Sequence, residues 1–201
     1  MINLFEPSLD FKEVNAIKKV IKSKWIGKGP LVREFENKFA SHCGQNSNNF
    51  LSTTSCTEAI FLSAKIFNFN SLDEIIIPTI SFPSIGSAVL DSGAKIVLCD
   101  VDKNSLNVTN DEIKKAITSN TKAVYVTHYA GIPCDMDSII ETCKENNILI
   151  IEDSACAVSS LYKNKACGTI GDMGMWSFDA MKSLSTGDGG MIYFKDIEKK
   201  I

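Results

Sequence analysis

The setting of Lys182 is the first feature of this sequence that points to chemistry. This lysine lies between a predicted strand, residues 175–178, and a glycine-rich turn that ends at Gly190, with hydroxyl side chains on both sides of it. Burial disfavours the charged form of a lysine, and a neutral amine can condense with an aldehyde. A lone lysine is usually just solvated, but glycines that let the backbone come close favour an enclosed amine here.

Asp153 is a second candidate, because it directly follows an apolar run. Residues 148–151 are typical of a buried strand, and Glu152 and Asp153 come immediately after them. A carboxylate at the carboxyl end of such a strand is poorly solvated, so we expect it to accept from a cationic partner or from an N–H group of a ligand. The alternative is an acid that merely caps the following turn.

A hydroxyl-rich segment follows another predicted strand and contains Ser55, Cys56 and Thr57. Ser55 and Glu58 have the spacing of a capping box, which opens a helix. The N–H groups and the positive dipole end of a helix N-terminus suit it to holding a phosphate. From this segment alone, a plain N-cap remains the simpler interpretation.

Phe82 lies in a fourth segment of this kind, residues 79–83, after a predicted strand that ends at Ile77. Its ring could lie flat against a planar ligand. An aromatic residue at a strand end is more often part of the core, so the sequence leaves both roles open.

Seven short β-type runs alternate with helical patterns and would bring these four segments together. In open parallel sheets, ligands bind beyond the carboxyl ends of the strands. The alternation predicts an α/β fold of three α/β/α layers with a mostly parallel, seven-stranded central sheet. The predicted strands are residues 50–52, 74–77, 95–98, 123–127, 149–151, 175–178 and 191–194, and the helices among them are residues 58–66, 84–91, 111–117 and 136–143.

Two further helices are expected before the first strand. Apolar residues at spacings of three and four, from Phe11 to Ile21, place one apolar stripe on a helix that ends near Trp25. Pro30 suits the first turn of a second helix, whose predicted buried face contains Val32, Phe35 and Phe39.

The charge balance and the cysteine content exclude several classes of protein. The 201 residues carry 21 Lys and Arg against 24 Asp and Glu, and a net charge of −3 argues against a nucleic-acid binder. No apolar run is long enough to span a membrane and no secretory signal is evident, so we expect a cytoplasmic protein. Seven cysteines without a C-x-x-C pair, together with two histidines, argue against a metal site.

Taken together, these segments resemble the nucleotide-sugar aminotransferases of the DegT/DnrJ family, which are fold type I enzymes dependent on pyridoxal phosphate. The motifs that carry the resemblance span almost the whole chain: WIGKGP at residues 25–30, GIPCDMD at 131–137, IEDSA at 151–155, SFDAMK at 177–182 and TGDGG at 186–190. The resemblance implies that residues 1–201 form the large domain that binds pyridoxal phosphate. It also implies that Lys182 forms the internal Schiff base and that Asp153 pairs with the pyridinium nitrogen.

The resemblance assigns further residues to the same cofactor. Ser55, Cys56, Thr57 and Ser177 would hold its phosphate, and Phe82 would stack on its ring. Cys156 stands near the ring, at a position where the family often has glutamine. Cys56 stands where glycine is common, and its place at a helix N-terminus could lower its thiol pKa, although inert packing is the favoured interpretation.

The implied reaction moves an amino group from glutamate to a keto-sugar attached to a nucleoside diphosphate, as in the biosynthesis of amino sugars for surface polysaccharides. The amine of Lys182 would shuttle a proton between the substrate carbon and the cofactor. A subgroup of the family that dehydrates sugars carries histidine at the lysine position, so Lys182 favours transamination.

The length of the chain departs from the family pattern. Family members continue into a smaller C-terminal domain and share each active site with the neighbouring subunit of a dimer, whereas this sequence stops at Ile201. We expect an interrupted chain, which is either the product of a split gene or a truncation. It is then an aminotransferase, or the cofactor-bearing half of one completed by a second polypeptide, or a non-catalytic remnant of the fold. We also expect a homodimer, with the first helix and residues 25–30 near its interface.

Overall fold

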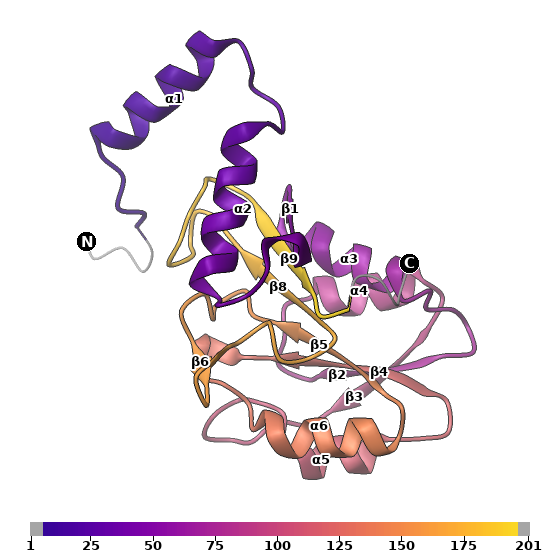
Figure 1. The fold of residues 1–201 in the computed structure, drawn as a ribbon. Helices are drawn as coiled ribbons and strands as arrows, with labels where there is room; N and C mark the ends of the chain where they lie inside the picture. The colour runs from indigo at the N-terminus through magenta and orange to yellow at the C-terminus, as the bar shows by residue number, and fades with distance from the viewer. Residues whose placement is uncertain (1–5, 197–201) are drawn as a thin grey trace.

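The computed structural model describes residues 6–196, which form a central sheet with helices on both of its faces (Figure 1). The helices are α1 (Phe11–Ser23), α2 (Pro30–His42), α3 (Cys56–Ile66), α4 (Ser84–Asp91), α5 (Asn110–Ala116) and α6 (Met136–Glu145). The strands of the central sheet are β1 (Phe50–Thr53), β2 (Glu74–Pro78), β3 (Lys95–Cys99), β4 (Thr121–Thr127), β5 (Leu149–Asp153), β8 (Met173–Ser177) and β9 (Gly190–Phe194).

The central sheet has the strand order β1-β9-β8-β5-β4-β2-β3. Strand β9 pairs antiparallel with β1 and β8, whereas every other neighbouring pair in this order is parallel. Six strands therefore run in one direction and end at the same edge of the sheet. The prediction of a seven-stranded, mostly parallel sheet in an α/β fold is confirmed.

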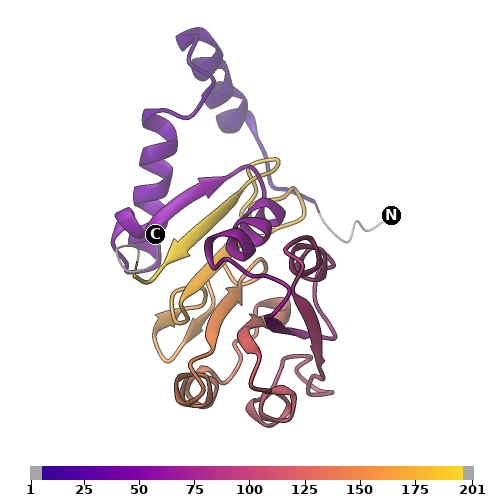
Figure 2. The ribbon, with the colours of Figure 1, turned by 90° about the vertical axis from the view of Figure 1, so that its right-hand side faces the viewer.

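The two faces of the sheet bury separate sets of apolar side chains, because neighbouring residues of a strand point to opposite faces. In β2, Ile75 and Ile77 pack with α3 and α4, whereas Ile76 packs with α5 and α6. Near β8 and β9, Trp176 packs against Phe39 of α2. The helices thus form an outer layer on each face (Figure 2), which is the predicted three-layer arrangement.

Helix α1 projects away from the sheet, and none of its residues is buried (Figure 1). Its predicted apolar stripe is present but exposed, with Phe11 at 83% and Ile21 at 63% of full exposure. The predicted buried face of α2 is only partly right: Phe39 is buried, whereas Val32 and Phe35 are half-buried. Glu36 is buried beside Phe39, because its carboxylate accepts from Ser52 of β1 and from Lys28.

A two-stranded hairpin, β6 (Leu161–Tyr162) and β7 (Lys165–Ala166), was not predicted. Its strands have two residues each, which is too short for a period-2 pattern to be recognised. Strand β5 also runs two residues further than expected and includes Glu152 and Asp153, which pair with β8. Within residues 6–196, no helix has both the length and the apolar character needed to cross a bilayer.

Candidate active site

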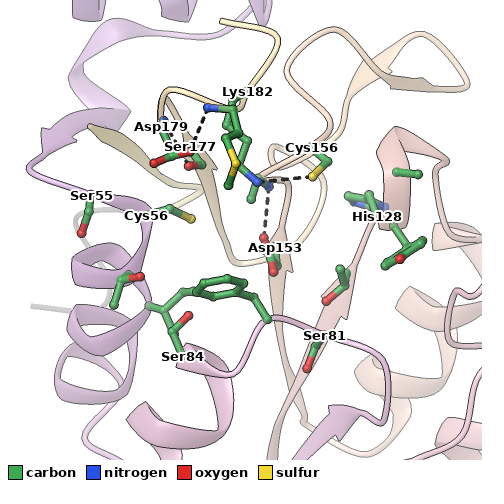
Figure 3. A pocket seen from close by; sticks show the side chains of 18 of the residues that line it. Ser55, Cys56, Ser81, Ser84, His128, Asp153, Cys156, Ser177, Asp179 and Lys182 are labelled. Carbon is green, nitrogen blue, oxygen red and sulfur yellow. Dashed lines mark hydrogen bonds between the residues drawn. The ribbon is translucent and has the colours of Figure 1, made fainter. Parts of the chain in front are cut away.

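A cavity of about 740 Å³ opens at the carboxyl ends of the parallel strands (Figure 3). It collects side chains from the loops after β1, β2, β4, β5 and β8, as expected for an open parallel sheet. The eight residues proposed from the sequence all line it: Ser55, Cys56, Thr57, Phe82, Asp153, Cys156, Ser177 and Lys182.

Lys182 enters the cavity from the loop between β8 and β9. Phe178 closes the base of this loop, because its N–H donates to Gly189 and its carbonyl accepts from Thr186, both at 2.9 Å. Gly189 has φ +153°, and a Cβ there would lie 2.7 Å from the Thr186 hydroxyl, so the tight closure requires glycine. Lys182 itself is half-buried, and its ammonium lies 3.6 Å from the sulfur of Cys156.

Asp153 is buried at the end of β5, with 3% of its surface exposed. One carboxylate oxygen, Oδ1, accepts from the Ala155 N–H at 3.0 Å. Burial raises the pKa of Asp153 above its usual value, and this effect exceeds the opposing influence of the Ala155 N–H and of the Lys182 charge. The carboxyl is therefore a group whose charged form would gain from a cationic hydrogen-bond donor in the cavity.

The start of α3 forms another wall of the cavity. Ser55 is the N-cap, and its hydroxyl accepts from the Glu58 N–H at 3.0 Å. The predicted capping box is half wrong, because the Glu58 carboxylate bonds the backbone and hydroxyl of Thr54 instead of the Ser55 N–H. The first N–H groups of the helix, those of Cys56 and Thr57, have no carbonyl partner within a helix.

Cys56 does not have the lowered thiol pKa that its place at a helix N-terminus suggested. The residue is 8% exposed, and burial raises the pKa of its thiol well above the usual value. The neighbouring charge of Asp153 raises it further, whereas that of Lys182 lowers it. Cys56 therefore acts in the packing between α3 and the sheet, where it belongs to the apolar core.

Phe82 and Cys156 are the more accessible members of the set. Phe82 is 63% exposed just before α4, so the core role that the sequence left open for it is excluded. Cys156 is the exposed member of the seven cysteines, and the other six are buried. Ser177 ends β8, and its hydroxyl accepts from the Asp179 N–H at 3.4 Å.

Several polar residues that line the cavity were not among the proposed site residues, and Ser84, Thr127 and His128 are three of them. The hydroxyl oxygens of Ser84 and Thr127 are buried and have no hydrogen-bond partner within residues 6–196. Buried polar atoms without partners are rare, so these two are available to a ligand. Thr127 could have been found from the sequence, because it ends a predicted strand on the side where ligands bind.

The sequence profile of the DegT/DnrJ/EryC1/StrS aminotransferase family matches residues 7–200. The chain belongs to this family. It is 46% identical, over 98% of its length and 51% of the relative's, to dTDP-4-dehydro-2,3,6-trideoxy-D-glucose 4-aminotransferase of Saccharopolyspora spinosa. The chain thus spans about half the length of the curated relatives it matches.

Solved structures of other proteins have the same fold. The aminotransferase TlmJ from Streptoalloteichus hindustanus matches with a TM-score of 0.95 and 46% identity, covering 98% of this chain and 54% of that one. Spr1654 from Streptococcus pneumoniae, described in its PLP form, matches with a TM-score of 0.91 and 26% identity, covering 100% of this chain and 54% of that one.

Pyridoxal phosphate is the cofactor of the DegT/DnrJ/EryC1/StrS aminotransferases, and the residues of this cavity fit it. The molecule combines a flat ring, a basic ring nitrogen, an aldehyde and a phosphate. Asp153 offers a buried carboxyl for the ring nitrogen, Lys182 an amine for the aldehyde, and the start of α3 its N–H groups for the phosphate. The hydroxyls of Ser84 and Thr127 are further buried polar atoms without partners in the described structure.

Proposed function

We propose that residues 1–201 form the cofactor-binding large domain of an aminotransferase that acts on a nucleotide-linked keto-sugar. The single observation that carries this proposal is that Lys182 and Asp153 line one cavity, from the ends of the neighbouring strands β8 and β5. An amine on the loop after β8 and a buried acid at the end of the neighbouring β5 are the pair that a lysine-bound pyridine cofactor needs.

Asp153 accepts a hydrogen bond from the ring nitrogen of the cofactor and thereby keeps a proton on that nitrogen. The bound cofactor then supplies an electron sink for the negative charge that develops at the substrate carbon. Lys182 anchors the cofactor through Nζ. The same amine would carry a proton to and from the substrate carbon.

The remaining residues of the set hold and orient the cofactor. The N–H groups of Cys56 and Thr57 and the hydroxyls of Ser55 and Ser177 bind its phosphate. The Ser55 hydroxyl accepts from Glu58 and the Ser177 hydroxyl accepts from Asp179, so each is free to donate its hydrogen to a phosphate oxygen. Phe82 stacks on the ring, and Cys156 lies beside it near Lys182.

The substrates follow from the family. The relative from Saccharopolyspora spinosa is named for a dTDP-linked keto-sugar, and we propose a nucleoside-diphosphate-linked keto-sugar as the amino acceptor here. Glutamate is the proposed amino donor, in line with the family resemblance. Such a reaction supplies amino sugars for polysaccharides or other glycoconjugates.

Further subunits complete the proposed enzyme. We propose that the chain forms a homodimer through the exposed apolar stripe of α1 and the neighbouring loop at residues 25–30. We propose that a second polypeptide supplies the part of the relatives' length that residues 1–201 do not span. A cytoplasmic site of action agrees with seven cysteines that form no disulfide.

Visible absorbance tests the proposal. Purified chain mixed with pyridoxal phosphate is expected to gain the visible band of a lysine-bound cofactor, and Lys182→Ala is expected to lose it. Lys65→Ala changes an exposed lysine of α3 and serves as the control. Transfer of the amino group from glutamate to a nucleotide-linked keto-sugar should disappear with the band. A wild-type chain that stays colourless with added cofactor would contradict the proposal and favour a non-catalytic remnant.

A further inference from the structure

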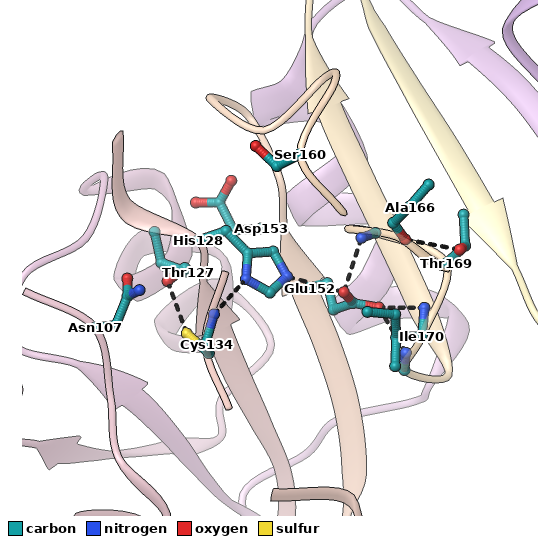
Figure 4. Close-up of polar contacts among 12 residues, drawn as sticks. Asn107, Thr127, His128, Cys134, Glu152, Asp153, Ser160, Ala166, Thr169 and Ile170 are labelled. Carbon is teal, nitrogen blue, oxygen red and sulfur yellow. Dashed lines mark hydrogen bonds and ion pairs between the residues drawn. The ribbon is translucent and has the colours of Figure 1, made fainter. Parts of the chain in front are cut away.

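Glu152 lies next to Asp153 in β5, but its side chain does not line the cavity. It is fully buried, and its two carboxylate oxygens accept four hydrogen bonds (Figure 4). Oε1 accepts from the Ile170 N–H at 2.7 Å and from the Gly171 N–H at 2.5 Å. Oε2 accepts from the Gly168 N–H at 2.7 Å and from His128 Nε2 at 2.9 Å.

His128 is the side-chain donor of this group. Its Nδ1 accepts from the Cys134 N–H at 3.2 Å, which assigns the ring proton to Nε2 and makes the imidazole a neutral donor to Glu152. The residue is 1% exposed, so both ring nitrogens are shielded from bulk solvent. His128 therefore links the loop after β4 to the end of β5.

The loop that supplies the three N–H groups packs directly on the sheet. A Cβ at Gly168 would lie 2.3 Å from the Trp176 ring, and a Cβ at Gly174 would lie 1.8 Å from the Gly168 carbonyl oxygen. A Cβ at Gly171 would lie 2.8 Å from the Ile150 carbonyl oxygen. Backbone this close to a sheet cannot be solvated, so its N–H groups require an internal acceptor, and Glu152 provides it.

The Glu152 group is tied to Asp153 through the backbone. Consecutive side chains of a strand point to opposite faces, so Glu152 is held on one face while Asp153 enters the cavity from the other. The backbone N–H of His128 donates to the Asp153 carbonyl at 3.1 Å. The backbone N–H of Ser154 donates to the Met175 carbonyl at 2.9 Å. The end of β5 is thereby fixed on both sides and on its buried face.

We propose that Glu152 and His128 are positioning residues, which hold the end of β5 so that the Asp153 carboxylate meets the ring nitrogen of the cofactor. This inference rests on the proposed function, because it takes Asp153 as the partner of that nitrogen. Glu152 and His128 would thus do more than stabilise the fold. They would fix the position of a buried acid that must bind a cation at a set distance.

The four donors require a carboxylate at position 152. An amide in Glu152→Gln would turn an NH₂ group toward two of the donors, and none of the three peptide N–H groups can become an acceptor. His128→Gln keeps an N–H donor near the position of Nε2, whereas His128→Leu removes it. The series therefore separates the effect of losing the hydrogen bond from the effect of changing the side-chain volume.

Cofactor affinity measured on the full chain tests the inference. Glu152→Gln and His128→Leu should weaken the binding of pyridoxal phosphate about ten-fold, the scale on which partners of a ligating side chain act. Both variants should also shift the pH at which the visible band has reached half of its change. His128→Gln should restore the affinity and this pH midpoint. Ser63→Ala is the control, because it removes an equally buried hydrogen bond, to Tyr125 at 2.6 Å, away from the cavity lining. It should lower the melting temperature without changing affinity or midpoint.

A measurement on the wild-type chain tests the inference even if the variants fail to fold. Because coupling between sites is reciprocal, cofactor binding should slow hydrogen exchange several-fold at the amides of Gly168, Ile170 and Gly171. Unchanged exchange, or variants that bind the cofactor as well as the wild type with the same midpoint, would overturn the positioning role alone. A wild type that binds no pyridoxal phosphate would overturn the proposed function, and this inference with it.

Discussion

The ammonium nitrogen of Lys182 lies 3.6 Å from the sulfur of Cys156, across the mouth of the cavity that also contains Asp153 (Figure 3). Cys156 is the exposed cysteine of the seven, and its thiol faces the amine that would bind the cofactor. A reagent that reaches this thiol therefore reports whether the space beside Lys182 is open or filled.

A maleimide is expected to modify Cys156 at least about ten-fold faster than Cys56, because the thiolate is the reactive form and burial raises the pKa of the Cys56 thiol. Pyridoxal phosphate should protect Cys156. Cys43, whose pKa burial raises to about 12, is the control cysteine. Mass spectrometry of the labelled peptides over time measures the rates. Equal rates for Cys56 and Cys156 would contradict the burial of Cys56.

Asp153→Asn should separate stability from cofactor binding. The folded-state pKa of Asp153 is raised by burial, so its charged form opposes folding once the pH rises above the unfolded pKa, about 3.9. At pH 7 the substitution should therefore stabilise the cofactor-free protein and raise its melting temperature. The gain should vanish near pH 3.

The same Asp153→Asn variant should lose the visible band or bind pyridoxal phosphate much more weakly, because a neutral amide does not hold a proton on the ring nitrogen. Asp172→Asn, at a carboxylate that accepts from the Ile150 N–H outside the cavity, is the comparison. Thermal melts and absorbance titrations at pH 3 and pH 7 give both quantities. A variant that melts lower than the wild type at pH 7 would refute the argument.

Most of the fold follows from local patterns in the sequence. The strand exits were predictable because buried runs such as 148–151 end abruptly in polar residues, and the topology of parallel sheets then brings those exits together. The hairpin of β6 and β7 was not predictable, because two-residue strands have no periodicity. Likewise, the apolar stripe of α1 predicted a helix. It did not predict whether another surface covers the stripe, because that depends on segments far away in the sequence or on a separate chain.

The chemistry of the site was predictable for residues whose type is unusual for their position, such as Lys182 and Asp153. His128 and Glu152 were not found as a pair, because their contact joins residues 24 apart and depends on the register of β4 and β5. The same limit applies to Glu36, whose burial inside an amphipathic pattern depends on partners in other segments.

Glu36 should contribute strongly to stability. Its Oε1 accepts from the Ser52 N–H at 3.0 Å, the Ser52 hydroxyl at 2.9 Å and the Lys28 ammonium at 3.0 Å. Burial alone would raise the pKa of Glu36, but these donors outweigh it and hold the pKa below its usual value. Glu36→Ala should therefore destabilise the protein by about 2 kcal/mol at pH 7, because it leaves the half-buried Ser52 N–H and hydroxyl without their acceptor.

Glu36→Gln keeps an acceptor at Oε1 and should lose only about 1 kcal/mol. Because the folded-state pKa of Glu36 is lowered, its contribution is complete above the unfolded pKa of about 4.3 and declines as the pH falls through the folded value. The difference between wild type and Glu36→Gln should therefore shrink in acid. Urea unfolding at pH 7 and pH 3 measures this difference in unfolding free energy. A difference that does not change with pH would contradict the contribution of the Glu36 charge.

The exposed stripe of α1 should mediate self-association. Val14 is 57% and Ile17 59% exposed, and in residues 6–196 nothing buries them. Val14→Glu with Ile17→Lys should convert a dimer into a monomer in light scattering, because charged groups would be desolvated at the interface. The unfolding free energy of the monomer should change by less than about 0.5 kcal/mol, since both positions are at the surface. Lys19→Glu, on the opposite side of α1, should remain dimeric. A monomeric wild type, or a double variant that still dimerises, would exclude this surface as the interface.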